Sequence, residues 1–210
     1  MSILTEINEN LQKGKAKIVC TLIETALAEN VAPKDIMQSM MDGMAVIGEK
    51  FKNNEVFVPE VLISARAMNR GLALLKPHLK ADDNMISGRV CIGTVKGDLH
   101  DIGKNLVKLM LESKGLEVID LGVDVSAETF VQTAIDQKCD IICCSALLTT
   151  TMSVMAEVVE KAKEAGIRDQ VKIMVGGAPV DQRFCDQIGA DVYTTDAASA
   201  ADAAKAFLTA

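Results

Sequence analysis

The sequence contains little of what several common functions require. It has no tryptophan, and aromatic residues make up only 3% of its 210 residues. Proteins that bind single-stranded nucleic acids stack the bases on aromatic side chains. A net charge of −7 would also repel a phosphate backbone. The composition therefore argues against a nucleic-acid partner.

Signals for membrane insertion and export are lacking as well. No apolar run reaches the roughly 20 residues that a membrane-spanning helix needs. The opening residues, MSILTE, have neither the basic region nor the apolar core of a signal peptide. We therefore expect a soluble, cytoplasmic protein with no membrane partner.

The cysteines do not form a recognisable ligand or disulfide pattern. None of the six makes a C-x-x-C pair. Cys91, Cys143 and Cys144 lie in apolar runs, where a cysteine mostly serves as a small buried hydrophobic residue. The pattern favours reduced, structural thiols over a disulfide framework or an iron–sulfur site. The chain is 49% hydrophobic, which is enough to bury a core.

Residues 1 to about 79 show the spacing of amphipathic helices. Apolar residues repeat every three or four positions, and Pro33 and Pro59 stand where a helix tolerates proline, in its first turn. Lys52-Asn53-Asn54 interrupts the pattern, and Pro77 ends it. Short connections between the segments predict a four-helix bundle. Its many methionines are expected to fill the core of that bundle.

The pattern changes after residues 80–88, KADDNMISG, which are polar and charged like a linker. From Arg89 onward, short apolar runs alternate with amphipathic segments. This alternation predicts a second domain, 89–210, with a five-stranded parallel sheet of the flavodoxin or Rossmann type, after a helical domain and linker at 1–88. Strands are expected at 89–95, 117–122, 140–146, 171–175 and 191–194, and helices at about 102–114, 126–138, 151–165, 180–188 and 197–208.

One of only two histidines follows the first of these strands, in the stretch GTVKGDLHDIGKN. A loop histidine is the commonest metal ligand, and Asp98 could accept a hydrogen bond from the second ring nitrogen of His100. Gly103 would let a bulky ligand approach. A solvent-exposed histidine beside two surface acids is the alternative interpretation. A single protein nitrogen does not make a zinc site, but it suits a metal already held by a macrocycle.

Two further loops leave the same edge of the predicted sheet. Residues 145–151, SALLTTT, offer four hydroxyls, and we expect Thr149 or Thr150 to cap the helix that follows. Residues 176–179 begin with a Gly-Gly step, and residues 193–197 flank them. Ligands of parallel sheets bind beyond the carboxyl ends of the strands. Small residues, hydroxyls and backbone N–H groups there would suit a long polar tail.

These motifs resemble those of a known family. DLHDIG fits the D-x-H-x-x-G signature of cobalamin-binding proteins, SALLT fits the accompanying S-x-L, and GGA fits the downstream Gly-Gly. The stretch FKNNEVFVPEVLISARAMNRGLALLKP is similar to the helical cap that precedes the cobalamin domain. Over nearly its whole length, the chain resembles the corrinoid proteins of methyltransferase systems and the cobalamin module of methionine synthase.

The resemblance implies a bound cobalamin or related corrinoid in the base-off/His-on state. His100 would be the lower axial cobalt ligand, and Asp98 would hold its other ring nitrogen. Thr151 matches the end of that relay, where a related protein has serine. The cap residues Phe51, Phe57 and Val58 match positions that cover the upper cobalt face. The other matched positions, which would surround the cofactor and its tail, are Leu99, Asp101, Ile102, Gly103, Ser145, Leu147, Thr149, Gly176, Gly177, Tyr193 and Ala197.

The resemblance also implies a function, that of a free-standing methyl carrier that is not catalytic alone. Such a protein accepts a methyl group on cobalt(I) from a substrate-specific methyltransferase of the methanol, methylamine, methoxyarene or betaine systems. It passes the group to an acceptor methyltransferase that uses coenzyme M or tetrahydrofolate. A reductive activase restores oxidised cobalt. The implied partners are therefore these three proteins.

Two alternatives from other functional classes stay open. One is a corrinoid-binding sensor that regulates a partner without methyl transfer. The other is a flavodoxin-like interaction domain that binds no cofactor. Methyl transfer in the presence of cognate partners would exclude the sensor. The interaction domain predicts that His100→Ala changes nothing measurable.

Overall fold

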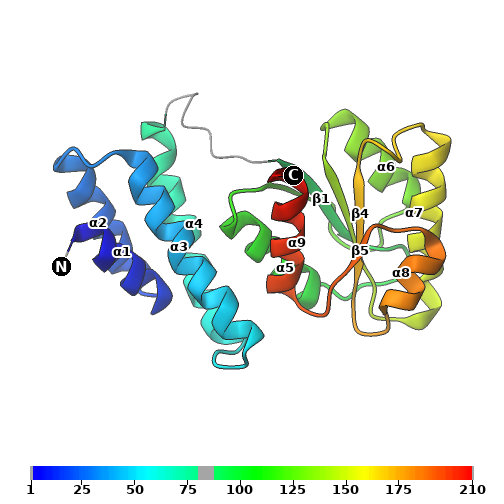
Figure 1. Ribbon diagram of the computed structural model, residues 1–210, viewed down its shortest axis with the longest axis horizontal. Coiled ribbons are helices and arrows are strands. Elements are labelled where there is room, and N and C mark those ends of the chain that lie inside the picture. Colours follow the sequence, from blue (N-terminus) through cyan, green and yellow to red (C-terminus); the bar gives the residue numbers. More distant parts are fainter. Residues whose placement is uncertain (1, 80–87, 210) are drawn as a thin grey trace. The chain divides into compact units, whose positions relative to one another are not determined.

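The computed structural model describes residues 2–79 and 88–209, so all but Gly88 of the predicted linker lies outside the described residues. The described chain divides into two compact units, a helical one and one built around a sheet (Figure 1). The sheet has five parallel strands within the described residues. The predicted fold class, a helical region followed by a parallel α/β domain, is confirmed.

The helices of the first unit begin where the sequence provides starting residues. Ser2 caps the first helix, where its Oγ accepts a hydrogen bond from the Thr5 N–H at 3.2 Å. Pro33 is the first residue of the third helix, a position where its missing N–H costs nothing. The helices are α1 (Ile3–Gln12), α2 (Ala16–Ala28), α3 (Pro33–Lys52) and α4 (Val58–Leu75), followed by a 3₁₀ turn at Lys76–His78.

These four helices of the described residues pack as a ring. Both α1 and α4 pack against α2 and α3. Four methionines lie in the interior, and each is at most 7% exposed: Met37, Met40, Met44 and Met68. The prediction that methionines fill this core is confirmed. Their flexible side chains fit irregular gaps between helices.

The second unit is a doubly wound sheet with the strand order β2-β1-β3-β4-β5. Its strands are β1 (Arg89–Thr94), β2 (Glu117–Asp120), β3 (Ile141–Ser145), β4 (Lys172–Gly176) and β5 (Val192–Tyr193). Its helices are α5 (Ile102–Ser113), α6 (Ala127–Asp136), α7 (Ser153–Glu164), α8 (Gln182–Ile188) and α9 (Ala197–Thr209). In Figure 1, α5 and α9 cover one face of the sheet, and α6, α7 and α8 cover the other.

Both faces of the central strands are buried, which explains why these strands read as continuous apolar runs. Successive residues Ile141 and Ile142 in β3 are both fully buried although their side chains point to opposite faces. All six cysteines lie within the described residues and are free thiols. Burial raises the pKa of Cys143 to about 12 and also raises that of Cys144, so both stay neutral and unreactive.

The winding of the sheet reverses between β1 and β3. The chain leaves β1 toward one face of the sheet and leaves β3 toward the other (Figure 1). Such a reversal opens the space in which doubly wound proteins bind their ligands. Thr94 and Ser145 are Cα partners at the ends of these two strands. The loops after β1 and β3 therefore start side by side.

One local prediction is wrong. Neither Thr149 nor Thr150 caps the helix that follows β3, because Thr149–Thr151 form a 3₁₀ turn and α7 begins only at Ser153. The residue before α7, Met152, already has helical backbone angles (φ −58°, ψ −30°). A capping side chain needs an extended backbone at that position, so no threonine is presented to the helix end.

Candidate functional site

Asp98 is the centre of the site in the loop between β1 and α5. Its side chain is completely buried, yet both carboxylate oxygens are occupied. Oδ1 accepts hydrogen bonds from the His100 ring Nδ1 at 2.6 Å and from the His100 N–H at 3.1 Å. Oδ2 accepts from the N–H groups of Leu147 and Leu148 at 2.7 and 3.0 Å and from the Thr151 hydroxyl at 3.1 Å. This carboxylate therefore joins the loops that follow β1 and β3.

The hydrogen bonds decide the charge of Asp98. Burial alone would raise the pKa of this carboxyl group, but the bonds from His100, Leu147 and Leu148 outweigh it and hold the pKa well below its usual range. The group is therefore an ionised acceptor at neutral pH. Its partner Nδ1 donates a ring proton to this carboxylate, so Nε2 is the ring nitrogen of His100 left for a further contact. The His100 side chain is 53% exposed, so the ring is fixed on one side and accessible on the other.

Thr151 supports Asp98 from the end of the second loop. Its side chain is 8% exposed, and Oγ1 lies 3.1 Å from Asp98 Oδ2 and 2.9 Å from the Leu148 carbonyl oxygen. A hydroxyl has one proton to donate, so these two acceptors share it. The relay position implied by the sequence resemblance thus contains a hydroxyl in hydrogen-bond contact with Asp98.

Two residues that hold this loop were missed by sequence reasoning. The Thr94 hydroxyl donates to the His100 carbonyl at 2.8 Å. Asp124, in the loop after β2, accepts from the Gly97 N–H at 2.7 Å through Oδ1 and donates its own N–H to the Asp98 carbonyl at 3.0 Å. Asp124 follows a strand at the same sheet edge as the other loops, and that position was the signal that could have identified it.

Exposed apolar side chains surround the histidine loop. Five large ones occur on the loops after β1, β2 and β3 and at the start of α5, each 37–79% exposed: Leu99, Ile102, Val123, Leu147 and Leu148. Apart from its chain neighbours and the backbone of its own helix, no described atom lies within 4 Å of where a Cβ on Gly103 would be. Exposed apolar surface of this kind marks a binding site. Three of the predicted residues, Leu99, Ile102 and Leu147, thus lie on an apolar rim beside His100.

The Gly-Gly step fits closely against the loop after β3. Gly177 has φ +128°, and a Cβ there would lie 1.8 Å from the Ala146 carbonyl oxygen. Only glycine fits such a position. The Ala146 N–H donates to the Gly176 carbonyl at 3.1 Å, and no described atom lies within 4 Å of a Cβ on Gly176. The two loops are locked together while the surface at Gly176 stays open.

The other predicted residues of the sheet unit occupy its carboxyl edge with varied exposure. Asp101 is exposed, and its Oδ2 accepts from the Asn105 side chain at 3.1 Å. Ser145 ends β3, and Thr149, which is exposed, starts the 3₁₀ turn. Tyr193 is half-buried against the core of the sheet, and Ala197, the first residue of α9, is 6% exposed. These residues thus lie at the ends of β3 and β5 and at the starts of α5 and α9.

The predicted cap residues belong to the helical unit, at the end of α3 and the start of α4. Phe51 and Val58 are half-buried, whereas Phe57 is 63% exposed. The Phe57 N–H donates to Glu60 Oε2 at 3.0 Å, which caps α4 and fixes the backbone that carries the ring. An aromatic side chain this exposed is available for contact with a ligand or partner.

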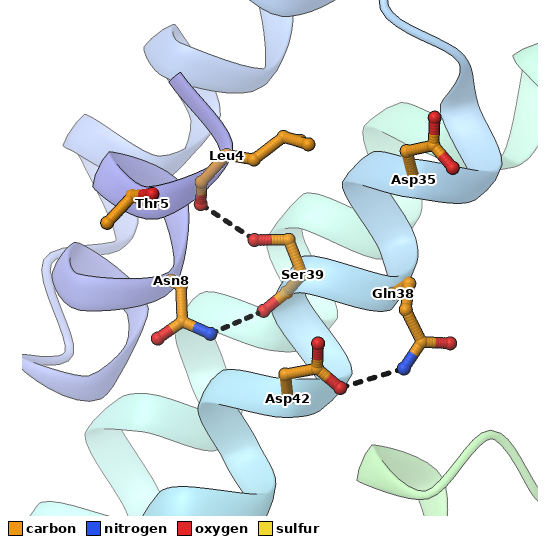
Figure 2. Close-up of a pocket in the computed structure, with 7 residues that line it drawn as sticks. All are labelled: Leu4, Thr5, Asn8, Asp35, Gln38, Ser39 and Asp42. Carbon is orange, nitrogen blue, oxygen red and sulfur yellow. Dashed lines mark hydrogen bonds between the residues drawn. The ribbon is translucent and has the colours of Figure 1, made fainter. Parts of the chain in front are cut away.

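A polar groove of about 440 Å³ lies between α1 and α3 of the helical unit (Figure 2). Its hydrogen bonds serve the packing of these helices. The Ser39 hydroxyl donates to the Leu4 carbonyl at 2.7 Å, and the Asn8 amide donates to the Ser39 carbonyl at 2.9 Å. None of the predicted cofactor residues lines this groove, so we assign it no part in the candidate site.

The donor atoms fit a metal that brings its own ligands. Across residues 2–79 and 88–209, no group of three or more His, Cys, Asp or Glu side chains could hold a metal ion. His100 offers one oriented nitrogen, and an apolar rim surrounds it. This set suits the cobalt of a flat, largely apolar macrocycle better than a bare cation, which requires several protein ligands.

The described helices also include none long and apolar enough to cross a bilayer.

Comparisons with known proteins agree with this chemistry. Residues 88–205 match a family model described as a B12 binding domain, and residues 3–76 match a second model with the same description. A corrinoid protein of Desulfitobacterium hafniense is 41% identical over 212 residues, which cover 99% of this chain and 98% of the relative. Trimethylamine corrinoid protein 1 of Methanosarcina mazei is 45% identical over 209 residues, which cover 98% and 97%.

A solved structure extends the similarity to three dimensions. The methanol:cobalamin methyltransferase complex MtaBC from Methanosarcina barkeri contains a chain that superposes with a TM-score of 0.89 at 32% identity. The superposition covers 99% of this chain and 80% of that chain. The family models, the relatives of matching length and the similar solved structure all agree. The chain therefore belongs to the family of B12-binding corrinoid proteins of methyltransferase systems.

Proposed function

We propose that this protein is a methyl carrier, whose corrinoid is held base-off by His100 and receives and delivers methyl groups between two methyltransferases. The single observation that carries the proposal is the buried, ionised Asp98 that orients the half-exposed His100 ring at 2.6 Å. A corrinoid supplies a cobalt centre that alternately accepts and gives up a methyl group. The protein alone has no catalytic role in this proposal.

Each part of the site has a task in the proposed carrier. Nε2 of His100 would be the lower cobalt ligand, because Nδ1 is committed to Asp98. The apolar rim around His100 would seat the macrocycle, and the open surface at Gly176 would accept the polar tail. We assign residues 1–88 to the cap and linker, in which Phe51, Phe57 and Val58 would shield the opposite cobalt face.

We assign three partners to the carrier: a substrate-specific methyltransferase, an acceptor methyltransferase and a reductive activase. The relatives named trimethylamine and dimethylamine corrinoid proteins favour a methylated amine as the donor. Reconstituted protein, incubated with a methylamine methyltransferase and an acceptor enzyme for coenzyme M or tetrahydrofolate, should transfer the methyl group. Corrinoid binding without any transfer in these cognate pairs would favour the sensor function.

The first test is reconstitution with hydroxocobalamin. Unbound cofactor is removed, and the visible spectra of the native protein and His100→Ala are recorded. We expect the native protein to retain the corrinoid with a nitrogen-ligated spectrum, and the variant to lose that signature. Circular dichroism shows whether the variant is folded. A folded native protein that retains no corrinoid would refute the proposal.

A further inference from the structure

Asp124 contacts the histidine loop through two of its own groups, although it belongs to a different loop. Its Oδ1 accepts the Gly97 N–H at 2.7 Å, and its N–H donates to the Asp98 carbonyl at 3.0 Å. Both contacts span more than 25 residues of sequence. They attach the loop after β1 to the loop after β2 immediately before His100.

Asp124 adopts a backbone conformation that most residues avoid. Its φ is +58°, in the left-handed region, where a residue with a Cβ is strained by roughly 1–2 kcal/mol and where glycine is not. Aspartate and asparagine tolerate this region better than other residues. Gly97, its hydrogen-bond partner, also has a positive φ of +83° and stands in a turn closed by the Asp98 N–H to the Val95 carbonyl at 3.1 Å. The side chain at position 124 thus makes a contact that a glycine there could not make.

The main chain around this contact is already fixed. Val95 and Val125 form an isolated parallel bridge, and the Val125 N–H donates to the Thr94 carbonyl at 3.0 Å. Asp124 immediately precedes Val125 of this bridge, so a rigid segment presents its carboxylate to Gly97. Asp98 is consequently held from both neighbouring strands. Its side chain is held by the loop after β3, and its carbonyl is held by Asp124.

We propose that Asp124 is a positioning residue for His100, the proposed cobalt ligand. Asp124 fixes the backbone of Gly97 and Asp98, and Asp98 in turn holds the His100 ring in one orientation. This inference rests on the proposed function, in which His100 binds a corrinoid. The hydrogen bonds of Asp124 to this loop are made with Gly97 and Asp98 and not with the His100 ring. Its effect passes through the backbone of the loop.

The test uses three variants of the full chain. Asp124→Gly keeps the left-handed backbone and removes the acceptor for the Gly97 N–H. Asp124→Asn keeps both the backbone preference and an acceptor oxygen. Lys138→Gly is the matched control, because Lys138 is another exposed residue of this unit with a positive φ (+53°) and has no part in the site.

Two readouts separate positioning from ordinary structural support. Amide hydrogen exchange of the cofactor-free protein over residues 96–100 reports whether the loop loosens, and hydroxocobalamin titration with visible spectra reports the ligation. In Asp124→Gly we expect exchange at least about tenfold faster and corrinoid affinity about 10–100-fold lower, the size of effect seen when outer-shell partners of metal ligands are lost. Asp124→Asn should restore both to within about threefold, and Lys138→Gly should change neither.

The proposal is overturned if Asp124→Gly matches Lys138→Gly in exchange, or if its exchange rises while affinity and the nitrogen-ligated spectrum stay native. Failure of Asp124→Asn to restore the native values would overturn it too. The native protein reports separately on the proposed function. If the native protein itself binds no hydroxocobalamin, the carrier function fails, and that result is distinct from any difference among the variants.

Discussion

The two proposed halves of the cofactor site are built in opposite ways. In the sheet unit, hydrogen bonds fix the histidine loop, and Asp98 is completely buried with both oxygens hydrogen-bonded to partners on two loops. In the helical unit, the start of α4 presents Phe57, an apolar ring that is 63% exposed. The hydrogen bonds of Phe57 are made by its backbone: its N–H donates to the Glu60 carboxylate, and its carbonyl accepts from the N–H groups of Glu60 and Val61.

In the proposed carrier, this difference matches what each half would supply. A metal ligand requires a fixed direction, and hydrogen bonds supply direction. A surface that covers a reactive face between partner visits requires contact area and adaptability, and an exposed apolar ring supplies those without fixing a geometry. Substitutions in the sheet unit should therefore affect stability and ligation strongly, and those at α4 should affect stability little.

The largest effect is expected from Gly177→Ala. A Cβ at this position would lie 1.8 Å from the Ala146 carbonyl oxygen at φ +128°, so the loops after β3 and β4 must separate. We expect a loss of more than about 3 kcal/mol in the free energy of unfolding, measured by urea denaturation. Gly166→Ala is the control, because it has φ +70° without a close contact and should cost about 1–2 kcal/mol. Equal losses would show that the two loops are not locked together.

Asp98→Ala should be next in size. The substitution leaves the N–H groups of Leu147 and Leu148 without their acceptor and leaves the Thr151 hydroxyl with only the Leu148 carbonyl. We expect a loss of about 3 kcal/mol in unfolding free energy and disappearance of the nitrogen-ligated spectrum. Asp98→Asn, which retains one acceptor oxygen, should lose less. A loss below about 1 kcal/mol for the alanine variant would contradict the account of this carboxylate as the anchor of both loops.

Acidification should lower the free energy of unfolding of the sheet unit over a defined pH range. Burial by itself would raise the pKa of Asp120, but hydrogen bonds from Lys104, the Gly122 N–H and Lys108 lower it from 3.8 to about 2. Because the pKa is lower in the folded state, this stabilisation is present above about pH 4 and is lost as the pH falls toward 2. We expect a loss of about 2 kcal/mol from this group, measured as the pH dependence of urea unfolding. The lowered pKa of Asp98 likewise stabilises the folded state, and this stabilisation is also lost as the pH falls.

The control for this prediction is Asp120→Asn. The variant should be less stable than the native protein at pH 7, and the difference between the two should shrink as the pH falls below 4. A difference that stays constant from pH 7 to pH 2.5 would mean that the ion pair with Lys104, a side chain only 3% exposed, does not stabilise the fold.

The smallest effect on stability is expected from Phe57→Ala. Because the ring is 63% exposed and the contact with Glu60 uses the backbone, the free energy of unfolding should change by less than about 0.5 kcal/mol. The nitrogen-ligated spectrum should persist, while affinity for hydroxocobalamin should fall by up to about tenfold, the equivalent of some 50 Å² of lost apolar contact. Loss of the nitrogen signature in this variant would break the division of tasks between the two halves.

The fold could be predicted from the sequence because its signals are local. Apolar periodicity and the positions of Pro33 and Pro59 indicated the helices, and the continuous apolar runs indicated the strands, most within one or two residues of their bounds. The threonine cap before α7 was predicted wrongly. The 3₁₀ turn at Thr149–Thr151 depends on the seating of Thr151 against Asp98, which is a contact between segments 53 residues apart.

The residues of the site could be predicted only where they belong to a recognisable sequence motif. His100 and Asp98 are neighbours in one loop, and their hydrogen bond follows from that spacing. The amides of Leu147 and Leu148 could not be foreseen, because every residue but proline has an N–H and the sequence does not show which will be used. Asp124 was missed for a related reason, since its contact depends on the register of β2 beside β1.

The long reach of Asp98 affects the order of events during synthesis. Its acceptor oxygen Oδ2 is satisfied only by residues 49 to 53 positions further along the chain. A chain that has emerged from the ribosome only as far as His100 therefore lacks the partners that anchor Asp98, until Thr151 has emerged and β3 has joined the sheet. In the proposed carrier, ligation of a corrinoid by an oriented His100 would accordingly follow folding of this part of the domain.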